Sequence, residues 1–319
     1  MRIRFEVTAG LLFILLLAPI AGRTAEVEEG QFYDRDRDRN VPFRAYWPNL
    51  AGVPAPVVIF SHGLGGTRET ASYFGRALAG SGYVSIHIQH PGSDGELVSQ
   101  ARSQEEAGQI LRASLGNLEN FLNRSNDIPF VIDELERRNN SGPWAGRFDL
   151  SRIGMAGHSY GARSTMFAAG EFVGPIGGLA REPRIKAGVV LSPNLPRRDF
   201  DPNRQFGDVR IPLFHITGTL DDVLAMGSGS ASRRTQPFKL IPYSPQYLLV
   251  LDGANHATFS GTRLGTDTEK PMDKDHTTTV SRAAVAFFDA HLRGLSSKEN
   301  WIKSKFSHSL VSGDHFKFK

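Results

Sequence analysis

The residues whose types and spacing are best suited to catalysis form a Gly-x-Ser-x-Gly pattern at residues 157–161. An apolar run at 153–156 precedes the pattern, and a helix-permissive stretch at 162–169 follows it. This layout is typical of a nucleophile elbow, in which a strand turns sharply into a helix and presents a serine hydroxyl at the apex. The two glycines suit such a turn because strand and helix come too close there for a Cβ atom. The pattern predicts Ser159 as the nucleophile of an acyl-transfer reaction; a serine in a glycine-rich turn without chemistry is the alternative.

A carboxylate and an imidazole follow this serine in the order that the chemistry needs. Asp221 comes just after the apolar run 211–218, and His256 comes shortly after the apolar run 247–251. The order serine, acid, histidine is the usual one for a nucleophile elbow. A histidine in a loop can place its imidazole between the hydroxyl and the carboxylate. We therefore predict that Ser159, Asp221 and His256 form a catalytic triad.

Other side chains compete for these roles. Asp222 directly follows Asp221 and is the alternative acid, and either aspartate could instead cap a turn. His276 is the alternative histidine, but it opens a predicted helix over 277–292, where a cap or surface role fits better. His62 precedes the serine in the chain, so we interpret it as a residue that shapes its loop rather than as the base.

A glycine-rich segment early in the chain could supply the remaining chemical groups. The segment 61–66, Ser-His-Gly-Leu-Gly-Gly, follows the apolar run 57–60. A serine nucleophile needs backbone N–H groups that bind the oxyanion formed during attack, one of them from the residue after the serine. We assign those donors to Leu64 and Tyr160. A glycine-rich turn from strand to helix without chemistry would have the same sequence pattern.

The elements that must position these residues are short apolar runs separated by helical stretches. Continuous apolar runs are typical of buried parallel strands. A continuous run occurs at 57–60, and further mainly apolar stretches predict strands at 83–88, 153–156, 184–191, 211–218 and 247–251. The sequence therefore predicts an α/β fold with a mostly parallel central sheet and helices on both faces, in a single domain over residues 26–319.

Three further expectations concern segments outside the predicted sheet. Asp127 is expected to be the N-cap of a helix that has Pro129 in its first turn. The segments 91–127 and 222–246 are expected to select the substrate. Residues 226–232, Met-Gly-Ser-Gly-Ser-Ala-Ser, are expected to form a mobile loop near the site.

Residues 1–25 have the composition of a secretory signal peptide. Arg2 and Arg4 precede an apolar run at 11–18 that is too short to span a bilayer as a stable helix, and small residues follow it. We expect cleavage near residues 22–26 and export to a bacterial envelope or medium, with an uncleaved membrane anchor as the alternative. Directly after this region the charges alternate over Asp34–Arg39, which is expected to form a solvated edge.

Composition argues against several other functions. The formal net charge is only +4, and no basic run is interleaved with aromatic residues, so nucleic-acid binding is not expected. The chain contains no cysteine, which rules out disulfides, zinc–thiolate sites and a cysteine nucleophile. His87 and His90 stand three apart on a predicted strand and point to opposite faces, so no metal site is expected there.

With these residues placed, the sequence resembles the α/β-hydrolase superfamily over nearly the whole chain that follows the signal peptide. It is most similar to a bacterial branch related to platelet-activating-factor acetylhydrolases and to the proteins called predicted dienelactone hydrolases. The resemblance is carried by residues 38–42 (Asp-Arg-x-Val-Pro), 60–65 (Phe-Ser-His-Gly-Leu-Gly), 89–93 (Gln-His-Pro-Gly-Ser), 157–162 (Gly-His-Ser-Tyr-Gly-Ala), 218–221 (Gly-Thr-Leu-Asp) and 254–256 (Ala-Asn-His). Dienelactone hydrolases use a cysteine nucleophile, so that activity is not carried over to this chain.

The resemblance implies two-step hydrolysis of carboxylic esters without a cofactor or a metal. His256 would take the proton of Ser159, and Asp221 would stabilise the resulting imidazolium. The implied substrates are short-chain or acetyl esters, either small molecules or lipids, including the acetyl groups of phospholipids. The alternatives are a polyester hydrolase, a phospholipase A2-type enzyme or a peptidase with the same triad, and an inactive fold that serves as a binding module. No membrane span is expected after removal of the signal peptide.

Overall fold

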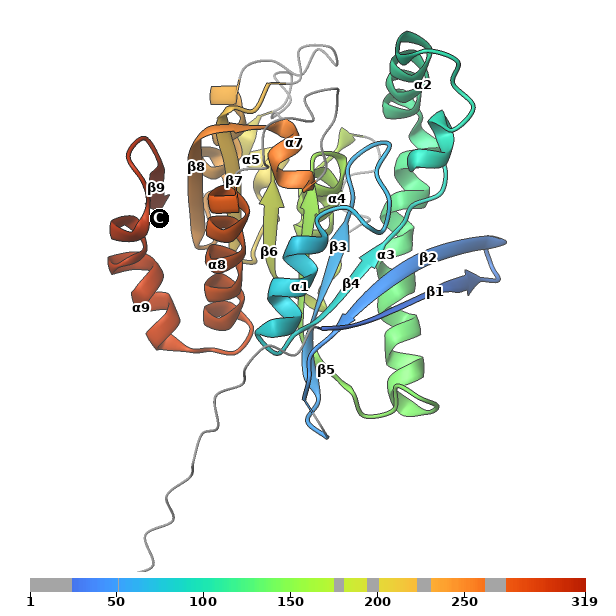
Figure 1. Ribbon diagram of the computed structural model, residues 1–319, viewed down its shortest axis with the longest axis horizontal. Helices are drawn as coiled ribbons and strands as arrows, with labels where there is room; N and C mark the ends of the chain where they lie inside the picture. Colours follow the sequence, from blue (N-terminus) through green and yellow to red (C-terminus); the bar gives the residue numbers. More distant parts are fainter. Residues whose placement is uncertain (1–24, 51, 175–180, 194–200, 223–230, 262–273) are drawn as a thin grey trace, which may run out of the picture.

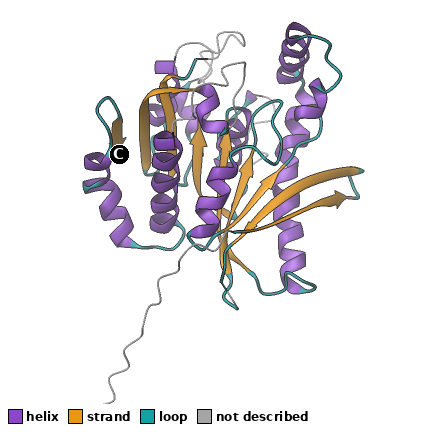
Figure 2. Cartoon of the chain, in the orientation of Figure 1, coloured by secondary structure: helices purple, strands orange, loops and turns teal. Residues whose placement is uncertain are grey.

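The computed structural model describes residues 25–50, 52–174, 181–193, 201–222, 231–261 and 274–319 (Figure 1). Its strands are β1 (Glu26–Asp34), β2 (Arg39–Trp47), β3 (Ala55–Ser61), β4 (Val84–Ile88), β5 (Phe148–His158), β6 (Ile185–Leu191), β7 (Leu213–Leu220), β8 (Gln246–Asn255) and β9 (His315–Phe318). Its helices are α1 (Ser72–Gly80), α2 (Gln104–Gly116), α3 (Leu118–Asn140), α4 (Tyr160–Ala169), α5 (Pro202–Phe206), α6 (Gln236–Leu240), α7 (His256–Ser260), α8 (Lys274–His291) and α9 (Ser296–Ser304). Strands and helices alternate along much of the chain, and Figure 2 shows the helices packed around the strands.

The described strands form one nine-stranded sheet in the order β1-β2-β4-β3-β5-β6-β7-β8-β9. The six strands from β4 to β8 in this order are parallel to one another. The outer strands β1, β2 and β9 pair antiparallel. The predicted α/β class with a mostly parallel sheet is therefore confirmed. Because parallel strands end at the same edge of a sheet, the residues that follow β3, β5, β7 and β8 gather at that edge, with β5 in the middle of the order.

Helices cover both faces of the sheet because its parallel strands are apolar on both sides. In β3, Val58 and Phe60 pack with residues of α1 and α8, whereas Val57 and Ile59 pack with residues of α3. Figure 1 shows α1 and α8 on one side of the sheet and α3 on the other. A fully buried side chain of this kind stabilises the fold by about 1.5–3 kcal/mol. Packing on both faces therefore supports the edge of the sheet at which the predicted site residues gather.

Helix α3 begins earlier than the sequence pattern predicted. The helix starts at Leu118, and its N-cap is Asn117, whose side chain accepts a hydrogen bond from the Asn120 N–H at 3.0 Å. Asp127 and Pro129 both lie inside the helix. The prediction that Asp127 caps a helix is wrong, because its buried carboxylate instead binds groups far away in the sequence.

The charged segment 34–39 is a solvated edge only in part, since Arg35, Asp36 and Asp38 are exposed but the other three residues are not. It contains the turn between β1 and β2, and two of its arginines bind that buried carboxylate. Arg39 Nε lies 2.8 Å and Arg37 Nη1 lies 2.9 Å from Asp127 Oδ1. The segment therefore ties the outer hairpin to α3 on the face of the sheet opposite α1.

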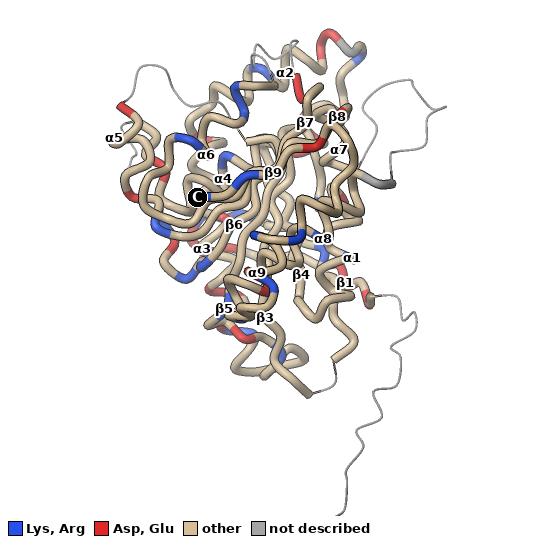
Figure 3. The backbone as a smooth tube through the Cα atoms, turned by 90° about the vertical axis from the view of Figure 1, so that its left-hand side faces the viewer, with Lys and Arg blue, Asp and Glu red and all other residues tan. Residues whose placement is uncertain are grey.

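The predicted signal peptide comprises residues 1–25, of which residues 1–24 lie outside the described part of the chain. Within the described ranges, no helix combines the length and the apolar character needed to cross a membrane. Figure 3 shows basic and acidic residues distributed among many elements of the molecule.

Candidate active site

Ser159 occupies the sharp turn between β5 and α4. Its backbone has φ 54° and ψ −111°, which is a strained conformation for a residue with a side chain. The Ser159 N–H donates to the carbonyl oxygen of Leu191 at 2.9 Å, which fixes the turn against the end of β6. The side chain is half-buried. The residue predicted to be the nucleophile thus stands at the apex of a tightly held elbow.

The two glycines of the elbow are required by close approach of the backbone. A Cβ atom on Gly157 would overlap the carbonyl oxygen of Gly161. A Cβ atom on Gly161 would in turn overlap the carbonyl oxygen of Ser61, at the end of β3. Neither neighbour is a flexible side-chain end that could move away. The predicted reason for these glycines, lack of space rather than backbone flexibility, is confirmed.

The structure brings Asp221 and His256 together at the same edge of the sheet. Asp221 directly follows β7, and His256 directly follows β8. His256 Nδ1 lies 2.7 Å from Asp221 Oδ1, within hydrogen-bond distance. Asp221 is fully buried, whereas Asp222 is exposed, and it is Asp221 that contacts the histidine. The geometry therefore favours Asp221 over Asp222 as the acid.

His256 begins a short helix, whereas the sequence predicted a loop. It is the first residue of α7, whose N-cap is Asn255. The Asn255 side chain accepts from the Thr258 N–H, and the Thr258 hydroxyl accepts from the Asn255 N–H, both at 3.1 Å. This reciprocal capping box fixes the start of the helix and with it the direction of the imidazole. The competing His276 lies in the first turn of α8.

Two partners of Asp221 were not found from the sequence. The Thr217 hydroxyl donates to Asp221 Oδ2 at 2.7 Å. Arg234, in the short 3₁₀ helix Ala231–Thr235, is buried and places Nε 3.2 Å from Asp221 Oδ1. Burial raises the pKa of Asp221, but the His256 hydrogen bond and the Arg234 charge outweigh it, so the pKa lies below its ordinary value. Asp221 is therefore ionised at neutral pH and can stabilise an imidazolium.

The rings of His158 and His256 place the elbow next to α7. His158 Nε2 donates to the carbonyl oxygen of His256 at 3.1 Å, and the two ring centroids are 4.7 Å apart. No hydrogen bond joins the Ser159 hydroxyl to His256 within the described residues. In hydrolases this bond is often long without substrate and tightens in the substrate complex. The arrangement leaves the half-buried hydroxyl available to an incoming acyl group.

The glycine-rich loop after β3 lies against the elbow. A Cβ atom added to Gly63 would stand 3.4 Å from the Cβ atom of Ser159. The Leu64 side chain packs on a small cluster that contains Tyr160. In the described part of the chain, neither the Leu64 nor the Tyr160 backbone N–H donates a hydrogen bond. Two free N–H groups beside a serine are what oxyanion binding requires.

His62 shapes this loop, in agreement with the prediction. Its Nε2 accepts from the His90 backbone N–H at 3.0 Å, and its Nδ1 donates to the carbonyl oxygen of Gly63 at 2.6 Å. Burial, together with the nearby Arg124 charge, holds the pKa of His62 well below its ordinary range. The ring is therefore neutral, each of its two nitrogen atoms makes a hydrogen bond, and the bond from Nδ1 holds Gly63 in place.

His87 and His90, at which no metal site was predicted, contact other groups of the protein. His90 bonds Ser61 and Asp127, and His87 Nδ1 lies 3.0 Å from the carbonyl oxygen of Thr70. Across the described ranges, no group of three or more histidine, aspartate or glutamate side chains is arranged to hold a metal ion. The predicted mobile loop 226–232 lies mostly outside the described residues, as do residues 223–230 of the segment 222–246.

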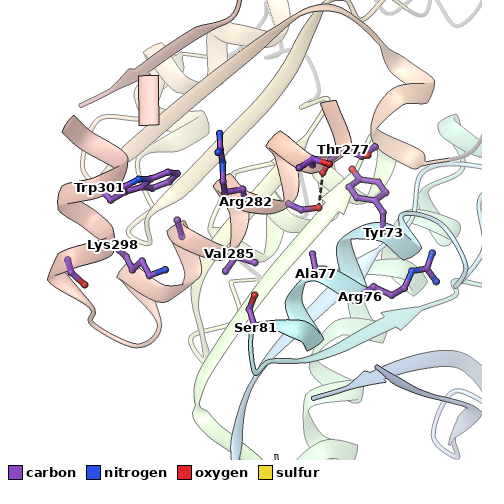
Figure 4. Close-up of a pocket in the computed structure, with 13 residues that line it drawn as sticks. Tyr73, Arg76, Ala77, Ser81, Thr277, Arg282, Val285, Lys298 and Trp301 are labelled. Atoms are coloured by element: carbon purple, nitrogen blue, oxygen red, sulfur yellow. Dashed lines mark hydrogen bonds between the residues drawn. The ribbon is translucent and has the colours of Figure 1, made fainter. Parts of the chain in front are cut away.

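A groove of about 870 Å³ lies away from this site, between α1, α8 and α9. Figure 4 shows Tyr73, Val285 and Trp301 on its lining, one from each helix. None of the three predicted triad residues lines it. The Tyr73 hydroxyl donates to the carbonyl oxygen of Phe259 in α7 at 3.1 Å, so the groove borders the helix that carries His256. The groove is a neighbouring surface feature and not the site of the predicted chemistry.

The sheet order, the strained serine turn and the acid–histidine pair at one edge define an α/β-hydrolase fold. The family model described as "Platelet-activating factor acetylhydrolase, isoform II" matches residues 41–125. A protein named platelet-activating factor acetylhydrolase from Cavia porcellus is 23% identical over 86% of this chain. The match spans 64% of that relative's length. The chain thus has an α/β-hydrolase fold and resembles the platelet-activating factor acetylhydrolases.

Proposed function

We propose that this protein is a serine esterase that hydrolyses carboxylic esters, with Ser159 as nucleophile, His256 as general base and Asp221 as the orienting acid. The observation that carries the proposal is the 2.7 Å contact between His256 Nδ1 and the buried Asp221, formed beside a strained serine elbow. Asp221 also binds the buried Arg234, but its bond to the half-buried His256 lies next to the Ser159 turn. An acid placed in this way orients the imidazole and stabilises its protonated form during catalysis.

The proposed mechanism has two steps. His256 Nε2 takes the hydroxyl proton of Ser159 while the oxygen attacks the ester carbonyl, and the imidazolium then protonates the leaving alcohol. Asp221 stays ionised and holds Nδ1–H in place, with Thr217 and Arg234 holding the carboxylate. Water next attacks the acyl-enzyme by the same route, which releases the acid and restores the hydroxyl.

Backbone donors complete the proposed site. The Leu64 and Tyr160 N–H groups would bind the oxyanion that forms in both steps. Loss of one such donor typically costs a factor of about 10² to 10³ in kcat. The Tyr160 N–H stands at the first residue of α4, where the helix dipole adds to the attraction for negative charge.

The proposed substrates are short-chain or acetyl esters, including the acetyl groups of phospholipids. The names of the matched family and of the Cavia porcellus relative support an acetyl ester, and the fold alone does not select among acyl groups. A series of p-nitrophenyl esters of increasing acyl length tests this choice. Activity that falls steeply beyond the acetyl and butyryl esters supports the proposal, and a preference for long acyl chains contradicts it.

The proposed nucleophile is tested by covalent labelling. Wild-type protein and the Ser159→Ala variant are treated with an organophosphonate and compared by intact-mass spectrometry. The expected result is one added phosphonyl group in the wild type and none in the variant, with ester turnover reduced by about 10⁴ to 10⁶ in the variant. An equal mass increase in both proteins places the nucleophile elsewhere. A wild type that neither labels nor hydrolyses any ester indicates a binding module instead of an enzyme.

We also propose that residues 1–25 act as a signal peptide and that residues 26–319 form one exported domain. The basic residues followed by a short apolar run support the first part. The continuity of one sheet from β1 to β9 supports the second.

A further inference from the structure

A second group of serine, histidine and aspartate side chains lies beneath the elbow. Ser61 Oγ is 2.9 Å from His90 Nε2, and His90 Nδ1 is 2.9 Å from Asp127 Oδ2. All three side chains are fully buried. This group has the order of a catalytic triad but no path to a substrate, so it must have another role.

The proton positions in this buried group follow from its surroundings. Burial, with the nearby Arg124 charge, lowers the pKa of His90 to about 3, so its ring is neutral. Burial raises the pKa of Asp127, but its bonds to His90 and Arg39 bring it down to about 2, so the carboxylate can only accept. His90 Nδ1 therefore carries the proton and donates to Asp127, and His90 Nε2 accepts the Ser61 hydroxyl proton. The Ser61 oxygen is thus oriented to accept from a donor on its other side.

That donor is Arg124, a fully buried arginine of α3. Its Nη2 donates to Ser61 Oγ at 3.0 Å and also to the carbonyl oxygen of His62. Its Nη1 donates to Ser93 Oγ at 2.8 Å. Among the described residues, no carboxylate lies within ion-pair distance of the Arg124 guanidinium. Burying a cation whose hydrogen bonds go only to neutral oxygens costs free energy, so a functional reason for Arg124 is expected.

The same guanidinium also contacts α4. Nε donates to Ser164 Oγ at 3.0 Å, and the Ser164 hydroxyl donates to the carbonyl oxygen of Tyr160 at 3.2 Å. The Arg124 guanidinium carbon lies 4.7 Å from the centre of the Tyr160 ring. Arg124 therefore connects the start of the Leu64 loop, through the His62 carbonyl, to the first turn of α4, through Ser164 and Tyr160.

We propose that Arg124 is a positioning residue that sets the separation of the two oxyanion donors, Leu64 and Tyr160. This inference rests on the proposed esterase function and deepens it. The planar fork of arginine holds both elements at once, whereas a lysine ammonium at this place is a single point donor and cannot reach all of these oxygens. The buried Ser61, His90 and Asp127 side chains keep the Ser61 oxygen turned toward the fork.

The test compares two substrates that differ in one atom. p-Nitrophenyl acetate develops an oxyanion, whereas p-nitrophenyl thionoacetate develops a thiolate-like anion that binds poorly in a hole shaped for oxygen. The ratio of their kcat/KM values therefore reports oxyanion binding and not stability. For Arg124→Lys we expect kcat for the acetate to fall by about 10² with KM changed less than about threefold, and the ratio to fall by about tenfold or more.

Two further variants make the result decisive. Ser164→Ala removes the hydrogen-bonded link to α4 and leaves the contact with the Tyr160 ring. It is expected to lower the ratio by about threefold, which keeps the test open if Arg124→Lys does not fold. Arg293→Lys is the matched control, since Arg293 also donates to backbone carbonyls, those of Ser81 and Gly82, but at the opposite end of β4. It is expected to leave the ratio unchanged. A ratio equal to wild type in both folded site variants overturns the inference, while an inactive wild type overturns the proposed function itself.

Discussion

Replacing Asp221 by Asn removes the charge that the site geometry places behind the histidine. The substitution keeps the shape of the side chain but turns one acceptor oxygen into an N–H₂ group. Asp221 accepts from His256 and lies against Arg234 through Oδ1, and accepts from Thr217 through Oδ2. If the N–H₂ group replaces Oδ2, the Thr217 hydroxyl can rotate to accept from it. If the N–H₂ group replaces Oδ1, it faces His256 and favours the wrong tautomer of the imidazole. We expect kcat to fall by about 10³ to 10⁴.

The same substitution should lower stability, by an amount that follows from the contacts of Arg234. Breaking a buried ion pair on one side costs about 3–5 kcal/mol. Arg234 keeps its bonds to the carbonyl oxygens of Asp221, Ser192 and Pro193 at 2.8, 3.2 and 3.0 Å, so we expect the lower end of this range. The corresponding decrease in Tm is roughly 5–10 °C, measurable by calorimetry.

The pH dependence of this stability loss has a definite sign. The pKa of Asp221 is lowered by folding, so its ionised form stabilises the native state at pH values above the unfolded carboxyl pKa of about 3.9. This contribution is lost as the pH falls through the folded pKa. The Tm difference between wild type and Asp221→Asn should therefore be constant from about pH 5 upward and shrink below about pH 4.

Asp222→Asn is the matched control for this prediction. Asp222 is exposed and makes no contact with His256 in the described structure, so both kcat and Tm should stay close to wild type. If Asp222→Asn loses activity and Asp221→Asn does not, the acid is assigned to the wrong residue. If Asp221→Asn is inactive but as stable as wild type at neutral pH, the reasoning about Arg234 is wrong.

Two other predictions address the elbow and the N-terminus. Gly161→Ala forces a Cβ atom into the backbone of Ser61, so we expect a loss of about 3 kcal/mol or more in the free energy of unfolding by denaturant titration. Gly116→Ala, in α2 where a Cβ atom meets nothing within 4 Å, is its control, and an equal effect of both would contradict the steric reason. N-terminal sequencing of protein isolated from an expressing bacterium should begin between about residues 22 and 26, and a sequence that starts at Met1 would refute cleavage.

The sequence predicted the central sheet well because burial on both faces leaves a strong local signal. The run Val57–Phe60 lies in β3, the run at 153–156 lies in β5, and the run at 247–251 lies in β8. The outer strands gave weaker signals. β9 is short, alternates charged and aromatic residues, and is half-buried at one position only, so nothing in its local pattern indicated that it would close the sheet beside β8.

The candidate site was predictable where chemistry fixes residue type and order along the chain. Ser159, Asp221 and His256 each follow a strand of the same parallel sheet, which brings them to one edge. Their catalytic roles stay predictions. Arg234 could not be foreseen, because a surface arginine and a buried one look the same in sequence.

The error over Asp127 has a similar cause. A local reading takes an aspartate near a proline as a helix start, whereas its actual partners Arg37, Arg39 and His90 are separated from it by dozens of residues. Arg124 was missed for the same reason, since its acceptors come from three different elements. Tertiary partners of charged residues carry no local periodicity that a sequence pattern could detect.

The bond from the Ser159 N–H to the Leu191 carbonyl has a consequence for how the molecule refolds. This bond, the Asp221–His256 contact and the buried links of Arg124 all join segments that are far apart along the chain. Contacts of this kind form only after the intervening loops have closed, which makes them late events in folding. Helices and hairpins can therefore reform in a refolding chain well before the elbow is seated. We expect recovered enzymatic activity to lag behind recovered circular dichroism, so that activity counts only fully native molecules.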